Sequence, residues 1–203
     1  MFRKMLLSAA AVVMMLALHS AAQADPVVMA SQFGVTATVT NFSLVGNTFT
    51  FTINNTSSTG TITALGFNLP GNFNNFTLQS GSNANFVLAN DVNAQAGAQN
   101  FTSSFDFALL TGNNFGGGTV AEGIGPGQSA TFTVTGNFQG LTANQIATLI
   151  FARFQGIGPR DESEVITVTP GEIPEPATMI LLGTGLAGVA ARVRRRRNAT
   201  KSA

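Results

Sequence analysis

Apolar and polar residues alternate along much of the chain with the period of two that is typical of β-strands. In the clearest run, Phe49, Phe51 and Ile53 alternate with threonines. Because successive side chains of a strand point to opposite faces, the pattern predicts phenylalanines facing a core and threonines facing solvent. Residues 35–40 alternate in the same way, and residues 45–48 between the two runs favour a turn.

Several further segments have a strand-like composition, and clusters of Gly, Asn and Pro separate them. They are residues 61–69, 73–78, 85–88, 101–110, 130–135, 148–154 and 165–169. Short strands with such punctuation predict an all-β fold, an antiparallel β-sandwich with either an Ig-like or a jelly-roll order of strands. The one helical signal is at residues 141–146, where Thr142 is a good helix cap.

The first 24 residues have the pattern of an export signal. Arg3 and Lys4 precede an apolar run over residues 5–18, and the run leads to small residues with Ala22 and Ala24 at the positions of an A-x-A cleavage site. An apolar run of about 14 residues is short for a membrane span, which favours a cleaved signal peptide over an anchor.

A second uncharged apolar run covers residues 177–191. As a helix it would be about 22 Å long, and a snorkelling Arg192 helps it to span a hydrocarbon core of about 30 Å. We therefore expect one short C-terminal transmembrane helix. A basic tail over residues 192–203 follows, and the positive-inside rule places it in the cytoplasm. The cations proposed to stop transfer are Arg192, Arg194, Arg195, Arg196 and Arg197.

Directly before this run stands the tripeptide Pro174, Glu175 and Pro176. Its two prolines lack backbone N–H groups and favour extended backbone, which suits a segment that an enzyme must grip. The tripeptide, the Gly/Ala/Leu-rich apolar segment and the arginine cluster, in this order, resemble the PEP-CTERM sorting signal over residues 173–197. The sequence departs mildly from the family at Ile173, where the family often has Val.

The resemblance implies that an exosortase, an intramembrane transpeptidase-like enzyme, recognises the tripeptide and removes the tail. The precursor would be anchored in the inner membrane of a Gram-negative bacterium. The product would reach the cell surface or the extracellular matrix, in association with exopolysaccharide or biofilm. The tripeptide is then a processing site rather than a catalytic one. With the export signal and the strand pattern, we expect three parts, a signal peptide over 1–24, an exported β-sandwich domain over 25–172 and a sorting segment over 173–203.

The central segment, residues 25–172, carries eight acidic and two basic residues, and no Lys or Arg occurs from residue 5 to residue 152. Binding to nucleic acid is therefore not expected. The only aromatic residue type is Phe, which supplies apolar area without a polar group. Sugar-binding surfaces usually expose Trp or Tyr, so the composition disfavours glycan binding but leaves a loop-based site open.

The sequence contains few residues of the types that usually act as catalytic groups. The sequence has no Cys, and its one histidine, His19, lies in the predicted signal peptide, so neither a Ser-His-Asp triad nor a thiol nucleophile can form. We expect a non-enzymatic protein without a cofactor. One alternative is a secreted glycoside hydrolase that uses a carboxylate pair from Asp91, Asp106 and Glu122. Asp106 lies between Phe105 and Phe107 in the sequence, so its side chain is expected on the strand face opposite both rings.

The other alternative is a calcium- or glycan-binding adhesion module. The densest acidic group, Asp161, Glu162 and Glu164, offers hard oxygen ligands in a turn that Gly158 and Pro159 mark. It lacks the spacing of an EF-hand, so a charged loop or a guarded strand edge is the simpler interpretation. No metal site is expected, and these three residues are the candidates should one exist.

Overall fold

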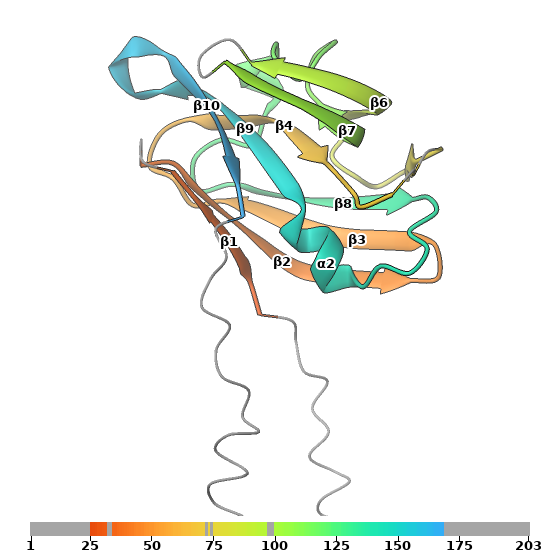
Figure 1. Cartoon of the computed structure of the whole chain (residues 1–203). Helices are drawn as coiled ribbons and strands as arrows, with labels where there is room; N and C mark the ends of the chain where they lie inside the picture. The colour runs from red at the N-terminus through yellow and green to blue at the C-terminus, as the bar shows by residue number, and fades with distance from the viewer. Residues whose placement is uncertain (1–24, 32–33, 72, 74, 97–99, 169–203) are drawn as a thin grey trace, which may run out of the picture. The chain divides into compact units, whose positions relative to one another are not determined.

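The computed structural model describes residues 25–31, 34–71, 73, 75–96 and 100–168. Within them, two five-stranded antiparallel sheets stack as two layers (Figure 1), which confirms the predicted all-β class and is consistent with a β-sandwich. The first sheet has the order β1-β2-β3-β8-β5. Its strands are β1 (Val27–Ala30), β2 (Thr36–Val45), β3 (Thr48–Asn55), β8 (Ser129–Thr135) and β5 (Thr77–Leu78).

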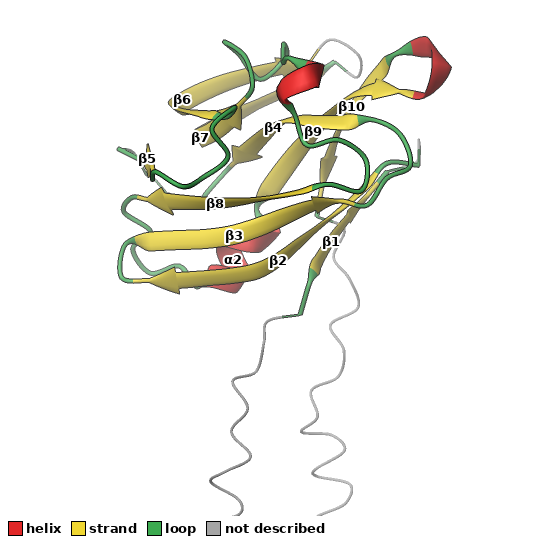
Figure 2. Cartoon of the chain, turned by 180° about the vertical axis from the view of Figure 1, so that it is seen from behind, coloured by secondary structure: helices red, strands yellow, loops and turns green. Residues whose placement is uncertain are grey.

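The second sheet has the order β10-β9-β4-β7-β6. Its strands are β10 (Glu162–Thr167), β9 (Ile150–Ile157), β4 (Thr61–Phe67), β7 (Phe101–Leu110) and β6 (Val87–Ala96). One seam between the layers is bridged where Met29 of β1 pairs with Val168, the residue that follows β10. Figure 2 shows the short β5 at the opposite edge of the first sheet, beside β8.

The helical signal is confirmed as α2 (Ala143–Thr148). Thr142 caps it with a capping box, in which its hydroxyl accepts a hydrogen bond from Gln145 N while the Gln145 side chain accepts one from Thr142 N. The predicted segment 177–191 lies outside the described residues. Among the residues that the structure describes, no helix is long and apolar enough to cross a membrane.

Phenylalanines from both sheets fill the space between the layers, as the alternation predicts. Phe51 lies at the centre of this core, where its ring contacts Phe49 and Phe132 of its own sheet and Phe67 of the other. The ring of Phe67 stacks on Phe107 with centroids 4.2 Å apart. Because Phe needs no hydrogen-bond partner, these rings fill the layer without adding polar side-chain groups that must be satisfied.

The outer face of the first sheet is a threonine surface, again as predicted. Register places the threonines of β3 directly opposite those of β8, and their hydroxyls lie within hydrogen-bond distance. The pairs are Thr48–Thr135 at 3.4 Å, Thr50–Thr133 at 3.2 Å and Thr52–Thr131 at 2.8 Å. No strand of this sheet contains a charged residue, so cross-strand hydroxyl pairs replace ion pairs on its surface.

The second sheet also has apolar residues on its outer face, which the alternation did not indicate. There Phe105 packs on Phe115 and Phe151, with ring centroids 4.8 and 5.2 Å away. Phe107, two residues along β7, belongs to the main core instead. The expectation that both rings share one face is therefore wrong. The β6–β7 ladder is interrupted opposite Asp106, where Asp91 has a positive φ of 52°, and the interruption reverses which side chains face the core.

This outer cluster depends on Gly66 of β4, because a Cβ built there would overlap the Phe105 ring. We predict that Gly66→Ala lowers the free energy of unfolding by about 1–3 kcal/mol through overpacking. Urea unfolding of the purified protein measures the change.

The matched control is the double variant Gly66→Ala, Phe105→Leu, in which the smaller side chain leaves room for the methyl group. Its loss of unfolding free energy is expected to be smaller than the sum of the losses in the two single variants, because the two residues are in contact. If the two losses simply add, the Phe105 ring is not the cause of the destabilisation by Gly66→Ala.

Candidate functional site

Several predicted site residues lie outside the described residues, so the structure gives no geometry for them. They are the cleavage residues Ala22 and Ala24, the tripeptide Pro174, Glu175 and Pro176, and the cations Arg192, Arg194, Arg195, Arg196 and Arg197. The candidate residues of the central segment are all described.

Asp106 anchors a loop. Its Oδ2 accepts a hydrogen bond from Leu69 N at 2.7 Å and its Oδ1 accepts one from Phe73 N at 3.4 Å. Both oxygens thus hold the backbone that follows β4, and the side chain is half-buried. A carboxylate used in this way is a structural acceptor rather than a solvated surface charge.

The structure brings two of the three hydrolase candidates to neighbouring positions. Asp91 and Asp106 stand opposite each other at the interruption of the β6–β7 ladder, between the pairs Asn90–Phe107 and Val92–Phe105. Glu122 is exposed and ends the 3₁₀ helix η2 (Val120–Glu122), away from either strand in the sequence. Both Asp106 oxygens are bonded to loop amides, so the observed role of this carboxylate is to hold the loop.

The acidic turn does not present its three carboxylates together. Asp161 follows the 3₁₀ helix η3 (Gly158–Arg160) in a left-handed conformation, Glu162 is exposed, and Glu164 is buried in β10 at 5% exposure. In the described part of the chain, no three His, Cys, Asp or Glu side chains gather as metal ligands would.

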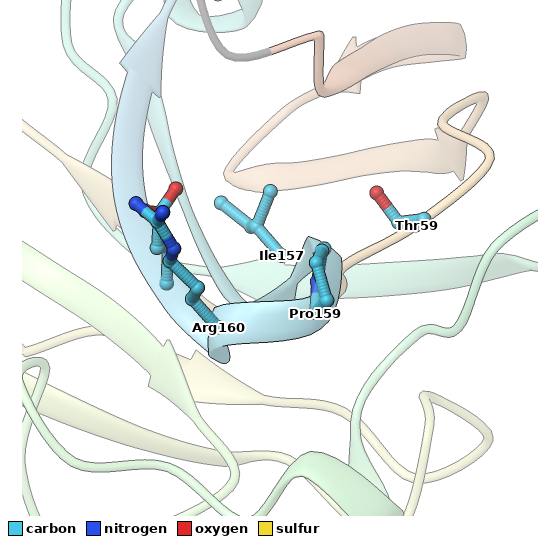
Figure 3. Close-up of a pocket in the computed structure, with 6 residues that line it drawn as sticks. Thr59, Ile157, Pro159 and Arg160 are labelled. Carbon is cyan, nitrogen blue, oxygen red and sulfur yellow. The ribbon is translucent and has the colours of Figure 1, made fainter.

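A hollow of about 380 Å³ lies beside this turn. Figure 3 shows Thr59 on one side and Arg160 on the other, with Ile157 and Pro159 between them. Gly158 and Glu162 complete the lining. One exposed cation and one exposed carboxylate over an apolar floor suit weak surface contacts.

Two larger hollows adjoin along β6. One, of about 570 Å³, is lined by Asn93, Ala94, Gln95, Thr102, Ser103 and Ser104, and the other, of about 650 Å³, by Asn93, Gln95, Asn114, Phe115, Gly116 and Gly117. Sequence reasoning missed both, because the contributing residues come from three separate segments of unremarkable polar composition. The sequence signal that could have indicated them is the amide residues within 93–95, together with the separate glycine-rich segment 112–118.

Arg153 is the one buried cation among the described residues, with 4% of its surface exposed. Its Nη2 donates to Ser163 Oγ at 3.5 Å, while Nε and Nη1 have no hydrogen-bond partner among the described residues. Burial lowers the pKa of Arg153 below its ordinary value, because desolvation disfavours the charged form.

We predict that Asp106→Ala lowers the free energy of unfolding by about 1.5–3 kcal/mol, since two backbone N–H groups lose a charged acceptor. Asp106→Asn keeps one acceptor oxygen and is expected to lose less. Glu122→Ala, an exposed carboxylate, serves as the control with a change within about 0.5 kcal/mol. Chemical denaturation measures all three, and equal stability of Asp106→Ala and the wild type would contradict the anchoring role.

Arg153→Met is expected to leave the free energy of unfolding unchanged or to raise it, because an apolar side chain of similar length avoids the cost of desolvating a cation. The exposed Arg160→Met is the matched control. A loss of more than about 2 kcal/mol in thermal or urea unfolding of Arg153→Met alone would show that the guanidinium is stabilising where it lies.

Comparison with known families identifies the C-terminal segment. No curated protein and no solved structure matches the chain. Residues 172–196 match the family model described as the PEP-CTERM protein-sorting motif, and they include the tripeptide, the uncharged run and most of the arginine cluster. The sequence resemblance is thereby confirmed, and the chain carries a PEP-CTERM protein-sorting motif, which implies an extracellular protein that exosortase sorts from a membrane-anchored precursor.

Proposed function

We propose that this chain is a non-enzymatic surface or extracellular-matrix protein, which exosortase cleaves at the tripeptide after export. The observation that carries the proposal is the match of residues 172–196 to the sorting motif. The proposed parts are a signal peptide over 1–24, an exported domain over 25–172 and a sorting segment over 173–203.

The order of events follows from membrane physics. Cations at both ends, Arg3 and Lys4 before the first apolar run and the arginine cluster after the second, favour the cytoplasmic side. The uncharged run of 177–191 partitions into the bilayer and arrests the chain there. The charge of Glu175 keeps the tripeptide at the aqueous face, where an enzyme embedded in the membrane reaches it.

The domain's own chemistry supports a role without catalysis. The exported part has no Cys or His, and the Asp106 carboxylate is bonded to two loop amides. Its exposed residues include many hydroxyl and amide side chains, which both donate and accept hydrogen bonds. We propose that the processed protein associates with exopolysaccharide in the biofilm of a Gram-negative bacterium.

The sorting proposal predicts that Glu175→Ala, or deletion of residues 194–197, leaves uncleaved protein in the membrane fraction. The first change removes the charge within the recognised tripeptide, and the second removes the cations that hold the tail in the cytoplasm. Intact mass and fractionation, in cells with and without an exosortase, measure both effects.

Glu162→Ala, an exposed glutamate of the two-sheet domain, is the matched control and is expected to be processed as the wild type. If both tail variants show the wild-type mass and location, or if the wild type has the same mass without exosortase, the proposal is wrong.

A further inference from the structure

We propose that the two adjoining hollows along β6 form one binding groove for a neutral glycan chain. The amide groove, as we call it, is lined by Asn93 and Gln95 of β6, Thr102 and Ser104 of β7, and Asn114 of the following loop. The inference rests on the proposed function in one respect, that the exported domain meets extracellular polysaccharide.

The two hollows adjoin, because Asn93 and Gln95 line both of them. It extends from the β6–β7 hairpin to the loop at 114–117, with hollows of about 570 and 650 Å³ on either side of the shared residues. Each is as large as an ordinary small-molecule site. Two such hollows in succession suit several units of a polymer better than one compact ligand.

The lining is polar and uncharged. Carboxamides offer both N–H donors and a carbonyl acceptor, and hydroxyls do the same with one group, which is the combination that the hydroxyls of a sugar require. Ser104 Oγ donates to Asn93 Oδ1 at 3.3 Å, and this bond orients the amide. Among the described residues, no other hydrogen bond engages the Asn93 side chain, so its Nδ2 donors remain for a ligand.

An anionic glycan fits this lining less well than a neutral one. No Lys or Arg lines either hollow, and the exported segment has six more acidic than basic residues. The carboxylate of a uronate would lose its hydration without gaining a cation as partner, and the net negative charge of the segment would repel it.

The loop makes the groove rigid and excludes a peptide strand. Phe115 is buried with 1% exposure, and Asn114 Oδ1 accepts a hydrogen bond from Gly117 N, so the loop is fixed before a ligand arrives. The backbone of Gly116 lies directly against the carbonyl oxygen of Gln95, where a Cβ would overlap it. A strand adding to β6 needs that carbonyl free, which leaves side-chain recognition as the available mode.

The test uses the full-length chain in detergent, titrated calorimetrically with neutral hexasaccharides of glucose, mannose and galactose, and with a hexauronate. We expect binding of at least one neutral chain and no binding of the uronate. The near-isosteric double variant Asn93→Asp, Gln95→Glu replaces donors by carboxylates, and we expect it to lose about tenfold or more in affinity. Gln139→Glu, an exposed amide outside the groove, is the matched control and is expected to bind as the wild type.

Absence of binding to every neutral chain, tighter binding of the uronate, or unchanged affinity of the double variant would each overturn the groove assignment. Thermal unfolding of the double variant, expected to match the wild type because both side chains are exposed, separates loss of binding from loss of fold. The intact-mass experiment on the tail is independent of the groove, so failure of either proposal leaves the outcome of the other readable.

Discussion

The apolar layer around Phe51 is the interaction on which the rest of the domain depends. Rings from β3, β8 and β4 meet there, and they join the two sheets in a chain that has no cysteine to form a disulfide. Burial of large side chains is the main favourable term in folding. Since Phe carries no polar group, the rings themselves add no side-chain donor or acceptor to satisfy, and the threonines on the opposite face of the same strands are left to the solvent.

Charge is divided between the two sheets in an unusual way. All charged residues within the described strands lie in the second sheet, on β6, β7, β9 and β10. The first sheet relies on paired threonine hydroxyls and on Asn54, whose Nδ2 donates to Thr38 and Thr40. Hydroxyl pairs are insensitive to ionic strength, whereas exposed ion pairs weaken as salt rises. A surface built in this way keeps its structure in media of very different salt content.

Sequence reasoning predicted the parts of the fold that depend on regular alternation. The strands around Phe51 and the cap at Thr142 follow from local pattern, and so does the all-β class. The second apolar face around Phe105 does not, because it depends on an interrupted ladder and on Gly66, which lies about 40 positions earlier in the chain. The tail motif is linear and can be read directly, whereas the amide groove joins residues from three segments, and Asp106 acts through backbone amides that no sequence pattern marks. The strand β1 is too short for its alternation to be distinctive.

The bridge between Met29 and Val168 joins the first and last strands of the domain. Contacts between residues so far apart in sequence raise contact order and slow folding, because a long loop must close before they form. Because β1 is the first strand and β10 the last, this seam forms only when both ends of the domain are in place. Until β10 has paired, the edge of β9 that it covers is open to other strands, so the last strand of the domain is also the one that protects that edge from strand addition.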